Sequence, residues 1–234
     1  MTRIAEIFGS SIVAVGDFNP AIFSPDWLER NGLLGAQDAE AARQGPSFIA
    51  SHQVSAFETE WFAVQVLENQ FSLTSKGALS PAFMDLAVGI LTLVRHTPIT
   101  AIGLNFMGHF KLASEAEYHK VGDVLAPKKI WDELYPDEEI SAGLGVLTVR
   151  IQNAPRGTTP KSGDEKRISL QSSGRVKFGI FLSYNNHREI HVDENDNQTS
   201  AECAAEIVTS EWQSSWDDAA RVFDGLISKT LADT

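Results

Sequence analysis

The stretch Thr100–Leu112 constrains the fold more than any other part of this sequence, because its side chains alternate in character. One set of alternate positions is large and apolar, and the other is small or polar: Ile102, Leu104, Phe106, Phe110 and Leu112 against Ala101, Gly103, Asn105, Met107, His109 and Lys111. Successive side chains of a β-strand point to opposite faces of a sheet. The stretch therefore predicts a strand with one face in the core and a second face that carries an amide and an imidazole.

The elements expected before this strand follow the order strand, helix, strand, strand, helix. A strand is predicted over Ser11–Phe18 and a hairpin within residues 51–75. Helices are predicted over Pro25–Asn31 and Pro81–Val94, because each follows a serine that can cap it and starts with proline. Together with Thr100–Leu112, this order matches the ferredoxin-like βαββαβ arrangement.

The rest of the chain predicts a second, related unit. A short helix near Lys128–Leu134 is followed by a strand over Ser141–Gln152, a polar loop over residues 154–165 and a hairpin of Arg167–Gln171 with Val176–Tyr184. A long helix is expected over Thr199–Leu231. We therefore expect an α+β fold with antiparallel sheets and helices on one side. A ferredoxin-like half (residues 1–113) precedes an α-βββ-α half (residues 114–234), the two packed as one compact unit.

Charge and composition narrow the classes of partner. The chain has 31 acidic and 19 basic residues, for a formal charge of −12. Nucleic-acid backbones are bound by clustered Lys and Arg, so direct backbone binding is disfavoured and a basic protein partner is favoured. The N-terminal residues resemble neither a signal peptide nor a membrane span, and Cys203 is the only cysteine. We expect a cytoplasmic protein without a membrane segment.

The candidate catalytic residues are His109, His119, Asp123 and His187. The first three are ligand types used by zinc or iron, but their spacing matches no tight metal signature. Alternatively His109 acts as a general base near Asn185 or His187, or Asn105 and His109 satisfy one another or backbone groups in a polar seam. The sequence lacks a GxSxG elbow, an HExxH motif and a glycine-rich phosphate loop. We therefore assign no metal and no cofactor.

Aromatic residues in the last predicted helix have two interpretations. Trp212, Trp216 and Phe223 belong to a broad apolar stripe whose members recur at three- and four-residue steps. Such a stripe is first of all core. If exposed, it would be a face that binds a partner.

Three short segments carry a resemblance to a group of bacterial proteins. They are FNPAIF near the start, HTPITAIGLNFMGHF in the middle and the aromatic C-terminal helix. This combination resembles uncharacterised, sporadically distributed bacterial proteins of about this length. The matching positions are Phe18, Pro20, Asn105, Trp216 and Phe223. The resemblance implies no established activity, and the patchy distribution suits an accessory role in phage defence or a toxin–antitoxin pair.

Two functions from different classes follow. The first is a non-catalytic binding protein, accessory or antitoxin-like, that contacts a protein partner and has Asn105, His109, Asn185, Trp212 and Trp216 as binding residues. The alternative is a histidine- or metal-dependent hydrolase, nuclease-like, that uses the region 105–123. A homo-oligomeric structural subunit is a third interpretation. We expect the non-enzymatic function.

Overall fold

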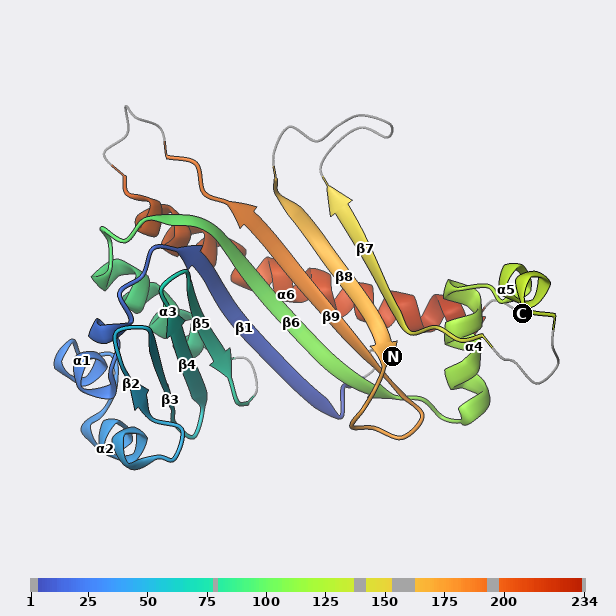
Figure 1. Cartoon of the computed structure of the whole chain (residues 1–234), viewed down its shortest axis with the longest axis horizontal. Helices are drawn as coiled ribbons and strands as arrows, with labels where there is room; N and C mark the ends of the chain where they lie inside the picture. Colours follow the sequence, from blue (N-terminus) through green and yellow to red (C-terminus); the bar gives the residue numbers. More distant parts are fainter. Residues whose placement is uncertain (1–3, 78–79, 137–141, 153–162, 193–197, 233–234) are drawn as a thin grey trace.

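One antiparallel sheet of nine strands forms the centre of the described residues, in the order β2-β3-β4-β5-β1-β6-β9-β8-β7 (Figure 1). The computed structural model describes residues 4–77, 80–136, 142–152, 163–192 and 198–232. The strands are β1 (Ile7–Gly16), β2 (Ile49–Ala50), β3 (Val54–Glu58), β4 (Phe62–Leu67), β5 (Gln70–Ser75), β6 (Ile99–Lys111), β7 (Val146–Gln152), β8 (Glu165–Ser172) and β9 (Gly179–Glu189).

The helices form where the sequence provides local start signals. They are η1 (Pro20–Ile22), α1 (Pro25–Arg30), α2 (Ala36–Gln44), α3 (Pro81–Leu93), α4 (Glu115–Leu125), α5 (Lys129–Leu134) and α6 (Ser200–Ala232). Ser24 Oγ accepts from the Trp27 amide at 3.1 Å, and Ser80 Oγ accepts from the Ala82 amide at 3.2 Å. The two predicted serine-proline helix starts are therefore confirmed.

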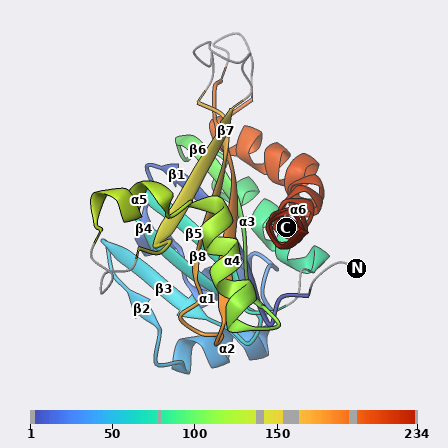
Figure 2. The same ribbon diagram turned by 90° about the vertical axis from the view of Figure 1, so that its right-hand side faces the viewer.

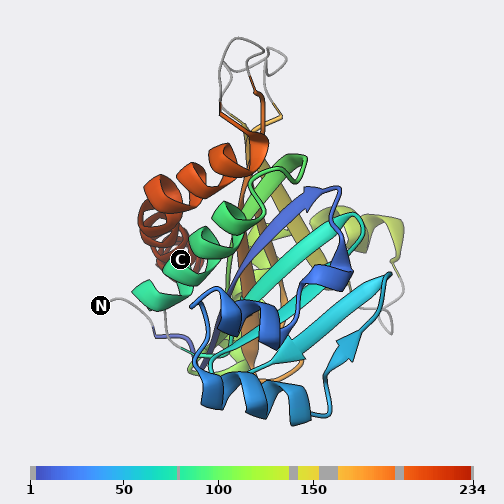
Figure 3. The same cartoon turned by 90° about the vertical axis from the view of Figure 1, so that its left-hand side faces the viewer.

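Helices α3 and α6 cover one face of the sheet: Figure 2 shows both on the same side of it, and Figure 3 shows them side by side. The apolar side of β6 faces them, as its alternation predicts. The Phe106 ring lies 4.8 Å from Trp212, and the Phe110 ring lies 5.7 Å from Phe223. The opposite side of β6 carries Asn105 and His109. The α+β class, with an antiparallel sheet and its main helices on one side, is confirmed.

The ferredoxin-like topology of the first half is not confirmed. Strand β1 pairs with β5 on one side and with β6 on the other, and both pairings are antiparallel. A βαβ crossover would make neighbouring strands parallel. Periodicity in a sequence shows the type of each element, whereas the pairing of strands depends on contacts between distant residues.

The chain instead contains the same arrangement of elements twice. Each half runs strand, helices, three antiparallel strands, helix, and the first half contains in addition the two-residue strand β2 before its three strands. In the sheet, β3-β4-β5-β1 corresponds to β7-β8-β9-β6, β2 lies outside β3, and the halves meet at the antiparallel β1–β6 pair. This arrangement places β6 with the elements after it, whereas the predicted segments 1–113 and 114–234 place it with those before it.

Polar groups from β8 and β9 fix α6 against the sheet. Tyr184 Oη and Lys166 Nζ donate to Asp218 Oδ2 at 2.8 and 2.6 Å, and Arg221 also pairs with this carboxylate. Burial would raise the pKa of Asp218, but the hydrogen bonds from Lys166, Arg221 and Tyr184 lower it to about 2. Burial and the bond to Asp218 raise the pKa of Tyr184 above its ordinary value. Asp218 is therefore ionised in the folded protein and anchors the helix.

Two further expectations from the sequence concern a membrane segment and a polar loop. Among the helices of the described residues, none combines the length and the apolar character that crossing a membrane requires. The predicted loop over residues 154–165 lies largely outside the described residues.

Candidate functional site

An asparagine pair occupies the middle of the sheet face that α3 and α6 leave uncovered. Asn105 on β6 lies directly opposite Asn185 on β9, and Asn185 Nδ2 donates to Asn105 Oδ1 at 2.6 Å. Asn105 Nδ2 donates to the carbonyl oxygens of Ser11 and Gly103, each at 3.3 Å. The structure thus joins two of the predicted binding residues.

Gly103 makes room for this pair. A Cβ at position 103 would lie 2.7 Å from Asn185 Nδ2, so any larger residue would displace the amide. Asn185 Oδ1 is buried and accepts no hydrogen bond from the described residues. The pair is therefore built into the sheet, with one acceptor left unused.

The two histidines of this face lie too far apart to act together. His187 is opposite Gly103, six residues along β6 from His109, which corresponds to about 20 Å. His109 Nδ1 lies 2.8 Å from Ser173 Oγ, and its ring packs on Phe181. Burial and the charge of Arg175 lower the pKa of His109, so its neutral form is favoured. Asn105 and His109 do not bond to one another: Asn105 bonds to Asn185 and to backbone carbonyl oxygens, which is the backbone alternative of the polar-seam interpretation, and His109 bonds to Ser173.

A buried carboxylate lies beside His187 on the same face. Glu165 on β8 is opposite His187 and is 4% exposed. Arg150 Nε and Nη2 donate to Glu165 Oε2 at 2.7 and 2.6 Å, and Arg167 pairs with the other oxygen. Burial would raise the pKa of Glu165, but the bonds from both arginines lower it. The carboxylate is committed to an internal arginine cluster and is not a general base.

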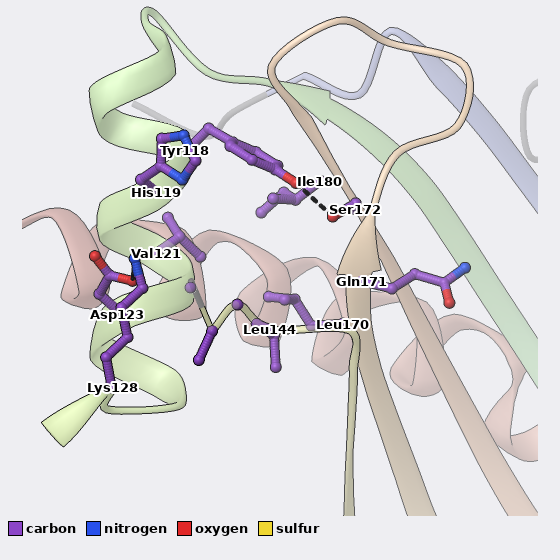
Figure 4. Close-up of a pocket in the computed structure, with 13 residues that line it drawn as sticks. Tyr118, His119, Val121, Asp123, Lys128, Leu144, Leu170, Gln171, Ser172 and Ile180 are labelled. Atoms are coloured by element: carbon purple, nitrogen blue, oxygen red, sulfur yellow. Dashed lines mark hydrogen bonds and ion pairs between the residues drawn. The ribbon is translucent and has the colours of Figure 1, made fainter. Parts of the chain in front are cut away.

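A pocket of about 320 Å³ opens between α4 and the ends of β8 and β9 (Figure 4). Apolar side chains from α4, β8, β9 and the segment before β7 line its interior: Val121, Leu144, Leu170 and Ile180. Tyr118 reaches across from α4 so that its hydroxyl contacts Ser172 Oγ at 2.5 Å. The volume is at the lower end of the range for small-molecule sites.

Two further predicted residues, His119 and Asp123, line this pocket, whereas His109 and His187 do not. Asp123 pairs with Lys128 at 2.9 Å, and His119 lies 3.8 Å from Glu115. Across the part of the chain that the structure describes, no three His, Cys, Asp or Glu side chains are arranged to hold a metal ion. The grouping His109, His119 and Asp123 therefore does not form as one site.

The tryptophans of α6 pack inward. Trp212 is 5% exposed and stacks on Phe106 and on Phe83, the latter at 5.6 Å. Trp216 is partly buried, and its ring lies 4.8 Å from Phe8. The core interpretation accounts for both residues, and the buried ring of Trp212 is not available to a partner.

Sequence reasoning missed an exposed apolar surface on α5 and the residue after it. We call Ile130, Trp131, Leu134 and Tyr135 the α5 surface; they are 64%, 49%, 63% and 58% exposed. Helix α5 has six residues, and none of them is buried. An isolated helix of this length is unstable in water. The sequence signal was the apolar content of a very short helix flanked by Pro127 and Pro136.

The pocket and the arginine cluster were also missed. Leu144, Tyr118 and Glu165 carry no local signal, because their roles depend on partners far away in the chain. No family model matches this chain, and no curated protein matches it. The resemblance to sporadically distributed bacterial proteins therefore stays an expectation, and function must be argued from the geometry.

Proposed function

We propose that this chain is a non-catalytic interaction protein that binds a protein partner through the α5 surface. The observation that carries the proposal is that α5 and the residue after it expose four large apolar side chains, while α5 buries none of its residues. Exposed apolar groups that lie close together are typical of protein-binding sites. Contact with a partner would also supply the tertiary packing that a two-turn helix needs.

The charge of the chain favours a partner with basic groups around its apolar contact. The formal charge of the whole chain is −12, and α5 itself carries two acidic residues, Asp132 and Glu133, against one basic residue, Lys129. A basic partner would associate faster and would bind less tightly as salt is raised. An antitoxin-like or other accessory role in a defence system, in which the chain covers a basic effector, is one form of this function.

Site-specific photocrosslinking tests the proposal. A photoreactive phenylalanine at position 131 is expected to capture one defined protein from the native host, while the same group at Ile22, which is 39% exposed, captures none. Leu134→Ser should reduce capture at least tenfold, and Leu93→Ser, at a position 41% exposed on α3, should leave it unchanged. Equal capture at positions 131 and 22, or capture that survives Leu134→Ser, would contradict the proposal.

The hydrolase is retained as a second candidate because His119 and Asp123 line one pocket. Its test is hydrolysis of single-stranded RNA and DNA by the purified protein, with His119→Ala and His96→Ala compared. Hydrolysis that disappears with the first variant and survives the second would favour the enzyme. Hydrolysis absent from the wild type, or unchanged in both variants, would remove it.

A further inference from the structure

The two edges of the sheet differ in how well they are protected against pairing with another strand. At one edge β2 has two residues, Ile49–Ala50. At the other edge β7 has seven residues, Val146–Gln152, and its outer side has no strand partner among the described residues. Very short edge strands are a common way to prevent edge-to-edge association. The β7 edge lacks this protection.

The side chains of β7 do not protect it either. Val146, Val149 and Ile151 are 65%, 44% and 50% exposed. The segment contains no proline, and its single charged residue, Arg150, is paired with Glu165 of the neighbouring strand. Charged side chains and proline are the usual features that keep an edge strand apart from other chains. A seven-residue edge without proline, whose one charged side chain is paired with the neighbouring strand, is suited to adding a strand.

The sequence of β7 is complementary to itself. In an antiparallel pairing of two copies about Val149, Leu147 lies opposite Ile151 of the second copy, and Thr148 lies opposite Arg150. Strand β7 pairs with β8 so that Leu147, Val149 and Ile151 share the face that carries Leu170 and Ile168. The aliphatic faces of both copies would then continue one apolar row, and no like charges would face each other. Centring on Arg150 would place two arginines together.

We propose that β7 is a homodimerisation edge, where two copies of this chain pair their β7 strands antiparallel about Val149. A two-fold symmetric contact requires a surface that is complementary to itself, and β7 in this register meets that requirement. Binding of an unrelated peptide would not require β7 to be self-complementary. The contact is small, so we expect association at high protein concentration only. Each copy carries a charge of −12, so added salt should strengthen the dimer by screening repulsion.

This salt response separates the dimer from the partner contact proposed for the α5 surface, which salt should weaken. Sedimentation over a concentration series at 0.05 and 0.5 M NaCl is expected to show a mass rising toward twice the monomer, more readily at high salt. Val149→Lys should weaken association at least tenfold. Val15→Lys, at a position 43% exposed on the inner strand β1, should leave it unchanged.

Disulfide trapping provides a second measurement, independent of the lysine variants. In a Cys203→Ala background, Val149→Cys is expected to form a covalent dimer on mild oxidation, because opposite positions approach within disulfide range. Thr148→Cys should not, since the two copies of residue 148 are offset in this register. A monomer at every concentration and salt, dimerisation of Val149→Lys equal to wild type, or cross-linking at 148 rather than 149 would overturn the proposal.

Discussion

The two halves of the sheet use the same arrangement of elements but fill it differently. In the first half, aromatic and aliphatic side chains close the space between the sheet and its helices: Leu28, Phe57, Phe62 and Phe71 are each at most 2% exposed. In the second half, the corresponding space beside α4 contains the 320 Å³ pocket, and α5 and β7 expose apolar groups. The comparison indicates that the first half contributes most to stability and that the second half offers surfaces for binding.

The largest expected effect contrasts a core residue of the first half with an edge residue of the second. Phe71→Ala removes a ring that packs on Phe18 and Phe23, and it should lower the free energy of unfolding by about 3–5 kcal/mol. Val149→Ala should change it by less than about 0.5 kcal/mol in dilute protein. Urea unfolding measures both values. Similar losses for the two variants would contradict the division of roles between the halves.

The second prediction concerns Asp218, the carboxylate that holds α6 of the second half on the sheet. The carboxyl group of Asp218 has a pKa of about 2 in the folded protein against an ordinary 3.8. A lowered pKa stabilises the folded state above pH 4, and this contribution is lost as pH falls toward 2. Asp218→Asn should lower the free energy of unfolding at pH 7 by roughly 2 kcal/mol. In this variant the free energy of unfolding should also fall less steeply between pH 4 and pH 2 than in the wild type.

Unfolding by urea at pH 7, 4 and 2 measures this difference between the wild type and Asp218→Asn. Asp217→Asn, next to it on α6, is the matched control. If the free energy of unfolding falls equally steeply between pH 4 and pH 2 in Asp218→Asn and in the wild type, Asp218 does not anchor α6.

Enlarging one leucine in each half tests the pocket directly. Leu28→Phe replaces a leucine that is 1% exposed with a larger aromatic side chain, and the resulting overpacking should lower the free energy of unfolding by about 1–3 kcal/mol. Leu144→Phe extends into the pocket beside α4 and should stabilise the protein by about 0.5–1 kcal/mol. Thermal unfolding compares the two variants. Destabilisation by both would mean that the second half is as tightly packed as the first.

The smallest expected effect concerns the asparagine pair. Gly103→Ala pushes the Asn185 amide away from Asn105 and should cost about 1 kcal/mol, the value of a hydrogen bond. Gly225→Ala on α6, where an added methyl group meets nothing within 4 Å, should instead stabilise by about 0.5–1 kcal/mol. The side-chain amide signals of Asn185 in NMR spectra report the displacement. Unchanged amide signals in Gly103→Ala would contradict the steric role of Gly103.

Features that depend on neighbouring residues could be predicted from the sequence. The two faces of β6 follow from alternation, and the starts of α1 and α3 follow from Ser-Pro pairs. Other features depend on distant residues. Asn105 and Asn185 are 80 positions apart, and Tyr118 and Ser172 are 54 apart. Unless the pairing of β6 with β9 is known, the sequence does not show whether Asn105 is a structural residue of the sheet or part of a binding site. The pocket beside α4 likewise has no local sequence signature.

The length of α6 has a consequence for how the molecule comes apart. Its 33 residues correspond to a length of roughly 50 Å. The helix packs on α3 of the first half and on β6 and α4 of the second half, so it spans both halves. Because α6 packs on elements of both halves, unfolding of either half would remove part of the contacts that hold this helix. We therefore expect one cooperative melting transition on heating, and slow amide hydrogen exchange that extends from α3 through the middle of α6 rather than stopping where the halves meet.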